Sequence, residues 1–272
     1  MIGFNQKTIA TRKVIIAIVF FACLASYFLA GLIFWPKDFV FQSMLGTASF
    51  CLTVFIGVMA FIKFFTRKKN KYLFIGSGFL AVAALEGYSL FVSSQIGSAL
   101  WTASRILLAA FLLLSLKGWR EGEGMQKGMK PRVYITAAAS ALLIILGVTL
   151  LPSFDPYWKF LFFTRPLELP AAALFGIGVF AYWQKHYWKF KFFEFWFLLS
   201  LLTAFFGQVY MAMSGEYFDA LFNLGYVIVI ISYVLALIGL LMSTYAAFKE
   251  VEAEKQIHQG HTKGEYYLKE KN

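Results

Sequence analysis

The sequence predicts an all-α integral membrane protein with eight transmembrane helices and both ends of the chain in the cytoplasm. First, 60% of the 272 residues are apolar and only 14% are charged, which is more apolar surface than one soluble core can hide. Second, the apolar residues form continuous runs of about 20, which match the thickness of a bilayer. Continuous runs favour helices over the alternating strands of a barrel. Third, the basic residues occupy every second connection between the runs.

This charge pattern predicts the orientation. All but four of the 25 Lys and Arg residues lie before the first apolar run, after the second, fourth and sixth runs, or in the tail. The exceptions are Lys37, Lys159 and Arg165 on the other side, and Arg105 inside a run. Cytoplasmic loops retain Lys and Arg, so both termini are expected to be cytoplasmic in a protein of the plasma membrane. The net charge of +11 then reflects topology and contact with anionic lipid, and a nucleic-acid partner is not expected.

The apolar runs divide the chain into three parts. Residues 1–13 are predicted to form a cytoplasmic N-terminus, residues 14–247 an eight-helix domain, and residues 248–272 a cytoplasmic helical extension and tail. The first run is longer than the apolar part of a signal peptide and lacks an Ala-x-Ala site, so it is expected to remain as a span. The predicted spans are 14–35, 39–65, 72–94, 98–117, 133–152, 166–184, 192–213 and 219–247.

Three connecting segments carry further expectations. Residues 118–132 are rich in glycine and charge and predict a cytoplasmic hinge between two halves of four helices. Residues 152–165 contain several aromatic side chains, which either lie at the membrane interface or form a lid over an outward-facing pocket. Strong helix formers continue from Ala247 to Ile257, so the eighth helix is expected to extend rigidly out of the membrane. Gly260 and Gly264 are typical of a frayed tail after that point.

Four ionisable residues, Glu86, Arg105, Glu168 and Glu194, lie inside spans, where such residues point to function by default. Glu86 is placed about 12 Å and Arg105 about 10 Å below the outer boundary, on adjacent antiparallel helices. We therefore expect a buried ion pair, and a purely structural role for that pair stays open. Glu194 lies near Lys191 and the inner interface, where it is expected to be solvated.

Polar and aromatic residues from five helices are expected at the same outer depth, whereas the inner half is almost purely apolar. We predict an outward-opening pocket for a small ligand at this level. The candidate ligand-binding residues are Glu86, Trp101, Arg105, Glu168, Gln208, Tyr210 and Asn223. No catalytic motif is present, so an enzyme is not predicted. No metal or cofactor is predicted either, because the three histidines lie in a loop or the tail and both cysteines fit packing positions.

Three stretches of the sequence carry a family resemblance. They are Phe74-Ile75-Gly76 with Leu100-Trp101-Thr102-Ala103-Ser104-Arg105, then Arg165-Pro166-Leu167-Glu168, and finally Gly207-Gln208-Val209-Tyr210 with Asp219, Asn223-Leu224-Gly225-Tyr226 and Ile231-Ser232-Tyr233. Together they resemble the membrane-associated sensor (MASE-type) domains, eight-helix modules of bacterial and archaeal histidine kinases and diguanylate cyclases. The resemblance covers roughly residues 72–247 and implies a sensor domain of a two-component or related signalling system. The family often has histidine where Glu86-Gly87-Tyr88 and Tyr226 stand, and its output domain is missing from the 272 residues.

Three functions remain open at this point. A signal-receiving module predicts a closed outer pocket and a last helix coupled to a cytoplasmic signalling domain or protein. A small-solute transporter predicts broken helices near the midplane and a polar path to the inner side. A lipid-modifying membrane enzyme predicts carboxylates grouped at one interface, for which Glu86 and Glu168 are the candidates. A homodimer is compatible with each of these functions.

Overall fold

The computed structural model describes residues 6–33, 35–36, 39–92, 94–116, 129–150, 160–216 and 218–269. Within these ranges all regular structure is helical, apart from one isolated bridge between Phe160 and Phe163. The helices are α1 (Gln6–Leu29), η1 (Ala30–Leu32), α2 (Phe39–Arg67), α3 (Asn70–Ser89), α4 (Ser94–Leu116), α5 (Met129–Leu150), α6 (Glu168–Gln184), η2 (Tyr187–Lys189), α7 (Phe192–Met213) and α8 (Ala220–Lys269).

Seven of these helices are long and apolar enough to cross a membrane, as expected for a multi-pass membrane protein. The remaining long helix, α6, has 17 residues. It begins at Glu168 directly after a turn at Pro166, and Pro170 occupies its first turn. Proline is tolerated there because the first amides of a helix need no partner within the helix.

Two helices extend far beyond the spans that the sequence predicts. α1 begins at Gln6 and so includes most of the segment predicted as the cytoplasmic N-terminus. An apolar run shows which residues lie within the membrane and does not show where the helix begins. Basic residues such as Lys7 and Lys13 are good helix formers and continue the helix beyond the apolar run. α8 continues through Gly260 and Gly264 to Lys269, because single glycines weaken a helix without ending it. Most of the predicted hinge and of the aromatic outer loop lies outside the described residues, and the last hinge residues, 129–132, form the beginning of α5.

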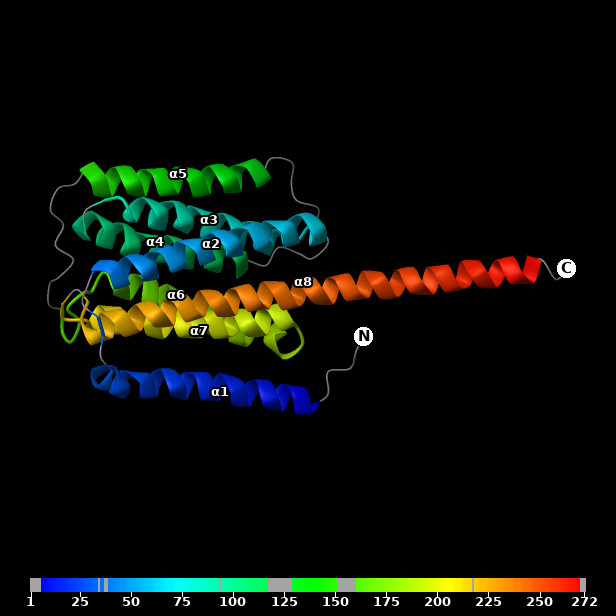
Figure 1. Cartoon of the computed structure of the whole chain (residues 1–272), viewed down its shortest axis with the longest axis horizontal. Helices are drawn as coiled ribbons and strands as arrows, with labels where there is room; N and C mark the ends of the chain where they lie inside the picture. Colours follow the sequence, from blue (N-terminus) through cyan, green and yellow to red (C-terminus); the bar gives the residue numbers. More distant parts are fainter. Residues whose placement is uncertain are drawn as a thin grey trace.

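The helices run back and forth along one axis (Figure 1). The connections from α2 to α3 and from α6 to α7 lie at the end of the bundle from which α8 extends. This end is called the basic end, because Lys7, Arg12, Lys185 and Lys189 lie there, and the opposite one is called the far end. The connections from α3 to α4 and from α7 to α8 lie at the far end.

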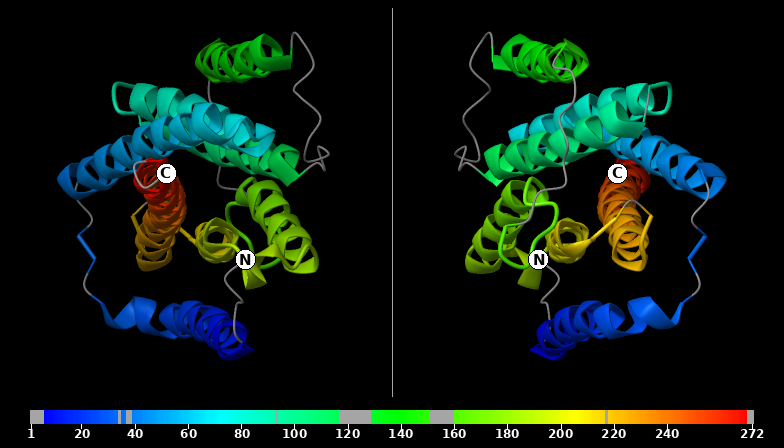
Figure 2. Two further views of the ribbon diagram at one scale, coloured as in Figure 1. Left: turned by 90° about the vertical axis from the view of Figure 1, so that its right-hand side faces the viewer. Right: turned by 90° about the vertical axis from the view of Figure 1, so that its left-hand side faces the viewer.

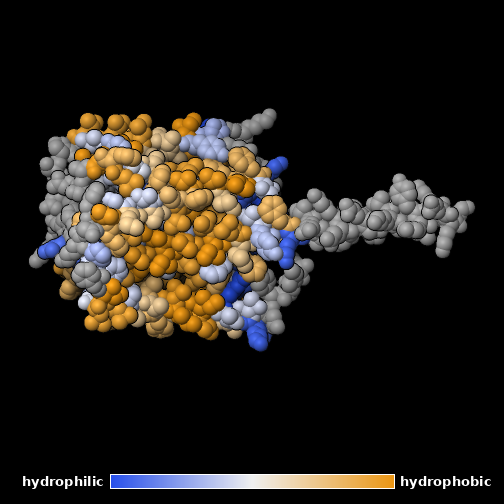
Figure 3. Space-filling model, viewed as in Figure 1, coloured by the Kyte–Doolittle hydropathy of each residue, from blue (hydrophilic) through white to orange (hydrophobic). Residues whose placement is uncertain are grey.

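Six helices pack into a central group, and two lie on its outside. α7 packs against α8 and α6, α3 packs against α4 and α2, and the two sets join through contacts of α2 with α8 and of α4 with α6. α1 lies against α7, and α5 lies against α3 and α4 (Figure 2). The outward sides of the peripheral helices expose large apolar residues such as Phe28 and Leu143, and apolar surface covers the middle of the visible face (Figure 3).

A close helix contact joins α7 and α8 through two glycines. A β-carbon added to Gly207 would lie 2.9 Å from the carbonyl oxygen of Gly225, and one added to Gly225 would lie 2.8 Å from the carbonyl oxygen of Gly207. Neither backbone can yield as a flexible side chain would. Small residues at such crossings let helices approach closely in membranes, where lipid tails are as apolar as the side chains. This contact fixes the position of α8 against the centre of the bundle.

Candidate functional site

The predicted ion pair between α3 and α4 is present. One terminal nitrogen of Arg105, Nη2, lies 2.7 Å from Oε1 of Glu86, and both side chains are almost completely buried. The other carboxylate oxygen of Glu86 accepts hydrogen bonds from the hydroxyls of Ser49 (3.1 Å) and Thr53 (3.3 Å) on α2. Three helices therefore meet at one carboxylate.

The Arg105 guanidinium is held otherwise by aromatic faces. It lies 4.3 Å from the ring centroid of Trp101 and 5.1 Å from that of Tyr233 on α8. Its Nε and Nη1 atoms have no hydrogen-bond partner among the described residues. A cation between two rings keeps part of the stabilisation that water would give it. Glu86 is therefore the anionic group that compensates the buried positive charge of Arg105.

A second buried ion pair lies beside the first and was missed by the sequence reasoning. Nη2 of Arg165 is 3.2 Å from Oε1 of Glu168, and both side chains are about 1% exposed. The hydroxyl of Thr102 donates to the same Glu168 oxygen at 2.6 Å, and Arg165 donates to the Ser98 hydroxyl at 3.0 Å. The signal in the sequence was the spacing of Arg165 and Glu168, three residues apart, just before and at the start of a helix.

The two ion pairs are linked through α4. Thr102 bonds Glu168 while Arg105, three residues later on the same helix, bonds Glu86. The cluster of two arginines and two glutamates is thus balanced in charge. Pairing is what makes four buried ionisable groups tolerable in a low-dielectric interior. Oε2 of Glu168 has no hydrogen-bond partner among the described residues.

A small cavity opens above this cluster at the far end of the bundle. Its volume is about 150 Å³, and its walls come from α2, the end of α3, the beginning of α4 and the beginning of α8. Trp101, Ser98 and Arg165 line it, together with Phe222 and Tyr226 of α8. Cavities of about 150 Å³ hold a molecule the size of benzene. The arrangement can bind a small ligand between aromatic rings, hydroxyls and one guanidinium.

The seven predicted site residues fall into three groups. Glu86, Trp101, Arg105 and Glu168 belong to the cluster below the cavity, and of these Trp101 lines the cavity itself. Asn223 lies between α2 and α8, where its side-chain oxygen accepts from Gln42 and its nitrogen donates to the Phe218 carbonyl at 3.0 Å. Gln208 and Tyr210 of α7 make up the third group.

Gln208 and Tyr210 point to different sides of α7. The Tyr210 hydroxyl donates to the carbonyl oxygen of Cys23 on α1, so the structure does not bring Tyr210 into the cluster. Gln208 is fully buried, and neither its amide nitrogen nor its amide oxygen has a partner among the described residues. One turn further along, the Ala212 carbonyl accepts from the backbone nitrogens of Thr164 and Arg165, each at 3.0 Å. Gln208 thus makes no hydrogen bond to either ion pair.

A separate polar cluster occupies the basic end and corrects one expectation. Glu194 is only 3% exposed and forms an ion pair with Lys71, so it is buried and paired rather than solvated. Two aromatic rings, Tyr72 and Phe193, lie 4.9 Å and 5.5 Å from the ammonium of Lys63, which is also buried. Glu194 is buried because other helices cover α7 on several sides. The position of Glu194 along its span does not reveal this covering.

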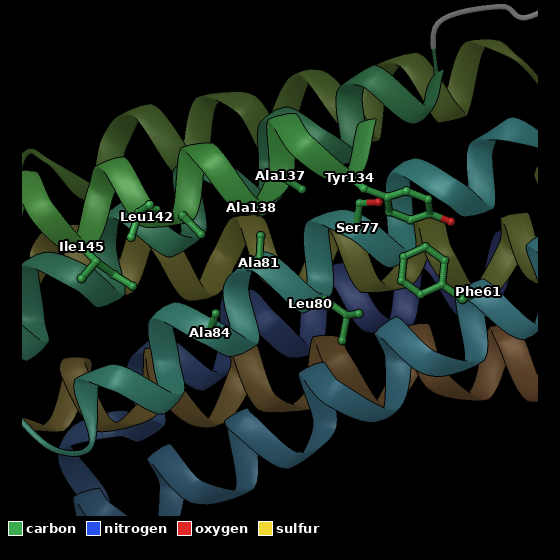
Figure 4. A pocket seen from close by; sticks show the side chains of 11 residues that line it. Phe61, Ser77, Leu80, Ala81, Ala84, Tyr134, Ala137, Ala138, Leu142 and Ile145 are labelled. Carbon is green, nitrogen blue, oxygen red and sulfur yellow. The ribbon is translucent and has the colours of Figure 1, made fainter. Parts of the chain in front are cut away.

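A second hollow, between α2, α3 and α5, is apolar. It measures about 420 Å³ and is walled by small residues of α3 and α5 such as Ala81, Ala137 and Ala141. Figure 4 shows Phe61 and Tyr134 close together at one end of it, near Ser77. Its lining holds no ionisable group apart from the Tyr134 hydroxyl, so the far-end cavity is the better candidate for recognising a ligand.

Comparisons with protein-family models, with curated proteins and with solved structures each found no match. The resemblance to MASE-type domains therefore stays a prediction.

Proposed function

We propose that this protein is a signal-receiving module of the plasma membrane, in which the far-end cavity binds a small ligand from outside and α8 carries the signal to a cytoplasmic signalling domain or protein. One observation carries the proposal. α8 supplies Phe222 and Tyr226 to the cavity wall, and the same helix runs without interruption past the basic end of the bundle (Figure 1). A ligand that contacts this helix differently in two arrangements changes their populations.

The topology in this proposal has eight spans with both ends in the cytoplasm. α6, with 17 residues, is about 25 Å long, close to the thickness of the hydrocarbon core of about 30 Å. It connects a turn at the far end to the loop with Lys185 and Lys189 at the basic end. Counting α6 as a span places the basic connections on one side, which the distribution of Lys and Arg favours.

The beginning of α8 is suited to transmit a change in the cavity. Asp219 caps the helix, since its carboxylate accepts from the backbone nitrogens of Phe222 (2.7 Å) and Gly215 (2.8 Å). Phe218, one residue earlier, lines the cavity and has a φ of 66°, a conformation that is unfavourable for a residue with a side chain. Backbone strain of this kind is concentrated at ligand-binding and switch sites. Occupation of the cavity by a ligand acts directly on this strained residue.

The lining indicates the class of ligand. Arg165 and Ser98 supply hydrogen-bond donors, and the rings of Trp101 and Tyr226, 4.9 Å apart, supply an apolar face. The Arg165 guanidinium is already paired with Glu168, which disfavours a strongly charged ligand. A small, flat molecule with a single polar group fits this lining best.

A small-solute transporter is the second candidate, and the buried cluster around Lys71 and Glu194 at the basic end favours it. Transport needs a polar path between that cluster and the cavity. The side chains between the two levels of α3 and α7 are instead tightly packed and mostly apolar, as at Leu73, Phe79 and Leu201, and the polar groups among them are the hydroxyls of Ser77, Ser200 and Thr203. The apolar layer favours the signal-receiving module.

The test measures whether the state of the cavity moves α8. Spin labels are attached at Thr66→Cys on α2 and Tyr245→Cys on α8, both exposed, after replacement of Cys23 and Cys51 by alanine. Ser89→Phe then fills the cavity with a side chain, because Ser89 lies in its wall. Pulsed dipolar spectroscopy in nanodiscs is expected to show a changed distance distribution between the labels.

Ser140→Phe on α5 is the matched control. Both serines donate to the carbonyl three residues earlier, and Ser140 lies away from the cavity. An unchanged distance in Ser89→Phe, or the same change in both variants, would contradict the proposal. Proteoliposome flux of small solutes that Glu86→Gln abolishes would instead establish transport.

A further inference from the structure

A cavity of about 490 Å³ lies at the basic end, between α1, α7 and α8. It is separate from the far-end cavity, whereas the cluster around Lys71 and Glu194 is near enough for Glu194 to interact electrostatically with Arg12. Its size falls within the range of about 300–1,000 Å³ that is typical of small-molecule sites. The side chains that matter for its chemistry are Lys7, Thr11, Arg12, Ile15, Trp196 and Met242.

The part of this cavity near the beginning of α1 is positively charged. Lys7 and Arg12 both line it, and none of the described residues in its wall is acidic. Arg12 is only 5% exposed, and its Nη1 donates to the backbone carbonyls of Trp188 (2.6 Å) and Lys191 (3.3 Å). Two phenylalanine rings of α7 lie about 5 Å from the same guanidinium. The positive charge is therefore held in place before any ligand arrives.

The part of the cavity further into the bundle is apolar. Ile15 and Trp196 lie one turn further into their helices than Thr11 and Phe192, and Met242 of α8 completes this part of the lining. The neighbouring outward face of α1 exposes Val14 and Ile18, at 56% and 60%, as expected of residues that face lipid. The cavity thus combines a basic end with an apolar continuation at a surface that lipid reaches.

We infer that this cavity binds an anionic phospholipid of the inner leaflet. The phosphate lies between Lys7 and Arg12, where the Thr11 hydroxyl is also in the wall, and the first acyl carbons lie against Trp196 and Met242. Basic pockets between transmembrane helices on the cytoplasmic side suit anionic head groups. A free phosphate ion matches the basic residues but leaves the apolar part unused. The inference is independent of any ligand in the far-end cavity.

The experiment uses the full chain in phosphatidylcholine vesicles that contain increasing fractions of brominated phosphatidylglycerol. Bromine quenches tryptophan fluorescence at contact, and the difference between the parent protein and Trp196→Phe isolates the signal of Trp196. We expect half-maximal quenching at a lower mole fraction with brominated phosphatidylglycerol than with brominated phosphatidylcholine. Lys7→Gln is expected to raise the required fraction of phosphatidylglycerol about fivefold, which corresponds to the ~1 kcal/mol that one basic residue contributes near an anionic surface.

Lys13→Gln is the matched control. It removes the same charge from the same helix, and Lys13 is exposed and lies outside the cavity lining. It is expected to leave quenching unchanged. Equal quenching by the two lipids, equal effects of the two substitutions, or displacement of the brominated phosphatidylglycerol by 10 mM inorganic phosphate would each overturn the inference.

Discussion

The ion pair between Glu86 and Arg105 gives the sharpest test of the buried cluster. Replacing Arg105 by leucine leaves the Glu86 carboxylate buried with the two hydroxyl donors, Ser49 and Thr53. Replacing Glu86 by leucine leaves a fully buried guanidinium with aromatic faces but no carboxylate. Breaking a buried pair from one side costs about 3–5 kcal/mol. We expect about 3 kcal/mol for Arg105→Leu and about 5 kcal/mol for Glu86→Leu.

The double variant separates a true pair from two independent residues. Exchange of a buried ion pair for apolar side chains of similar volume is often neutral or stabilising. Glu86→Leu with Arg105→Leu is therefore expected to recover most of the stability that either single change removes. The free energy of unfolding is measured by titration of the detergent-solubilised protein with sodium dodecyl sulfate, followed by circular dichroism. Losses that add within about 0.5 kcal/mol would refute the pairing.

Four further predictions concern other parts of the structure. Gln208→Met is expected to raise the free energy of unfolding in the same titration by about 1–3 kcal/mol, because it removes a buried amide without partners. Gly225→Ala is expected to lower it by about 1–3 kcal/mol through the clash with α7, whereas Gly147→Ala, which has open space, is expected to be neutral or stabilising. Glu194→Gln is expected to lower it by about 1.5–3 kcal/mol, because Lys71 loses its charged partner. Glu216→Cys, exposed at the far end, is expected to react with a membrane-impermeant thiol reagent from outside intact cells, and reaction from the cytoplasm alone would contradict the topology.

The sequence predicted the helical fold and the ion pair between Glu86 and Arg105. Both follow from where each residue lies along the membrane normal. Apolar runs place a residue along the membrane normal, and 1.5 Å per residue converts position into depth. Glu86 and Arg105 were therefore expected at one level on neighbouring helices, and the structure confirms their contact. Depth does not fix the rotation of a helix about its own axis. Gln208 and Tyr210 share a depth but lie on different sides of α7, which an estimate of depth cannot detect.

Other features were missed because they depend on which helices are neighbours. Glu194 is close to one end of its span in sequence, and its burial follows from side-chain contacts between α7 and the start of α3, through Lys71. The partnership of Thr102 with Glu168 requires α4 to lie beside α6, and no short connection in the chain implies that contact. The length of α8 was underestimated, since glycine in a helix has a cost that its neighbours offset.

The polar contacts of this protein join different pairs of helices, and this explains why a membrane bundle retains them. Glu86 with Arg105 joins α3 to α4, Glu168 with Thr102 joins α6 to α4, and Gln42 with Asn223 joins α2 to α8. Lipid tails are as apolar as leucine, so burial of apolar surface does not by itself select one helix arrangement. Directional polar contacts between specific residues do select one arrangement, because each requires a particular pair of helices to be neighbours. Polar groups that satisfy no such contact need another explanation, and Gln208 and Oε2 of Glu168 are the strongest examples among the described residues of the far half. Glu168 is paired with Arg165, which lines the far-end cavity, so under the proposed function a ligand or water in that cavity is the expected partner of Glu168 Oε2.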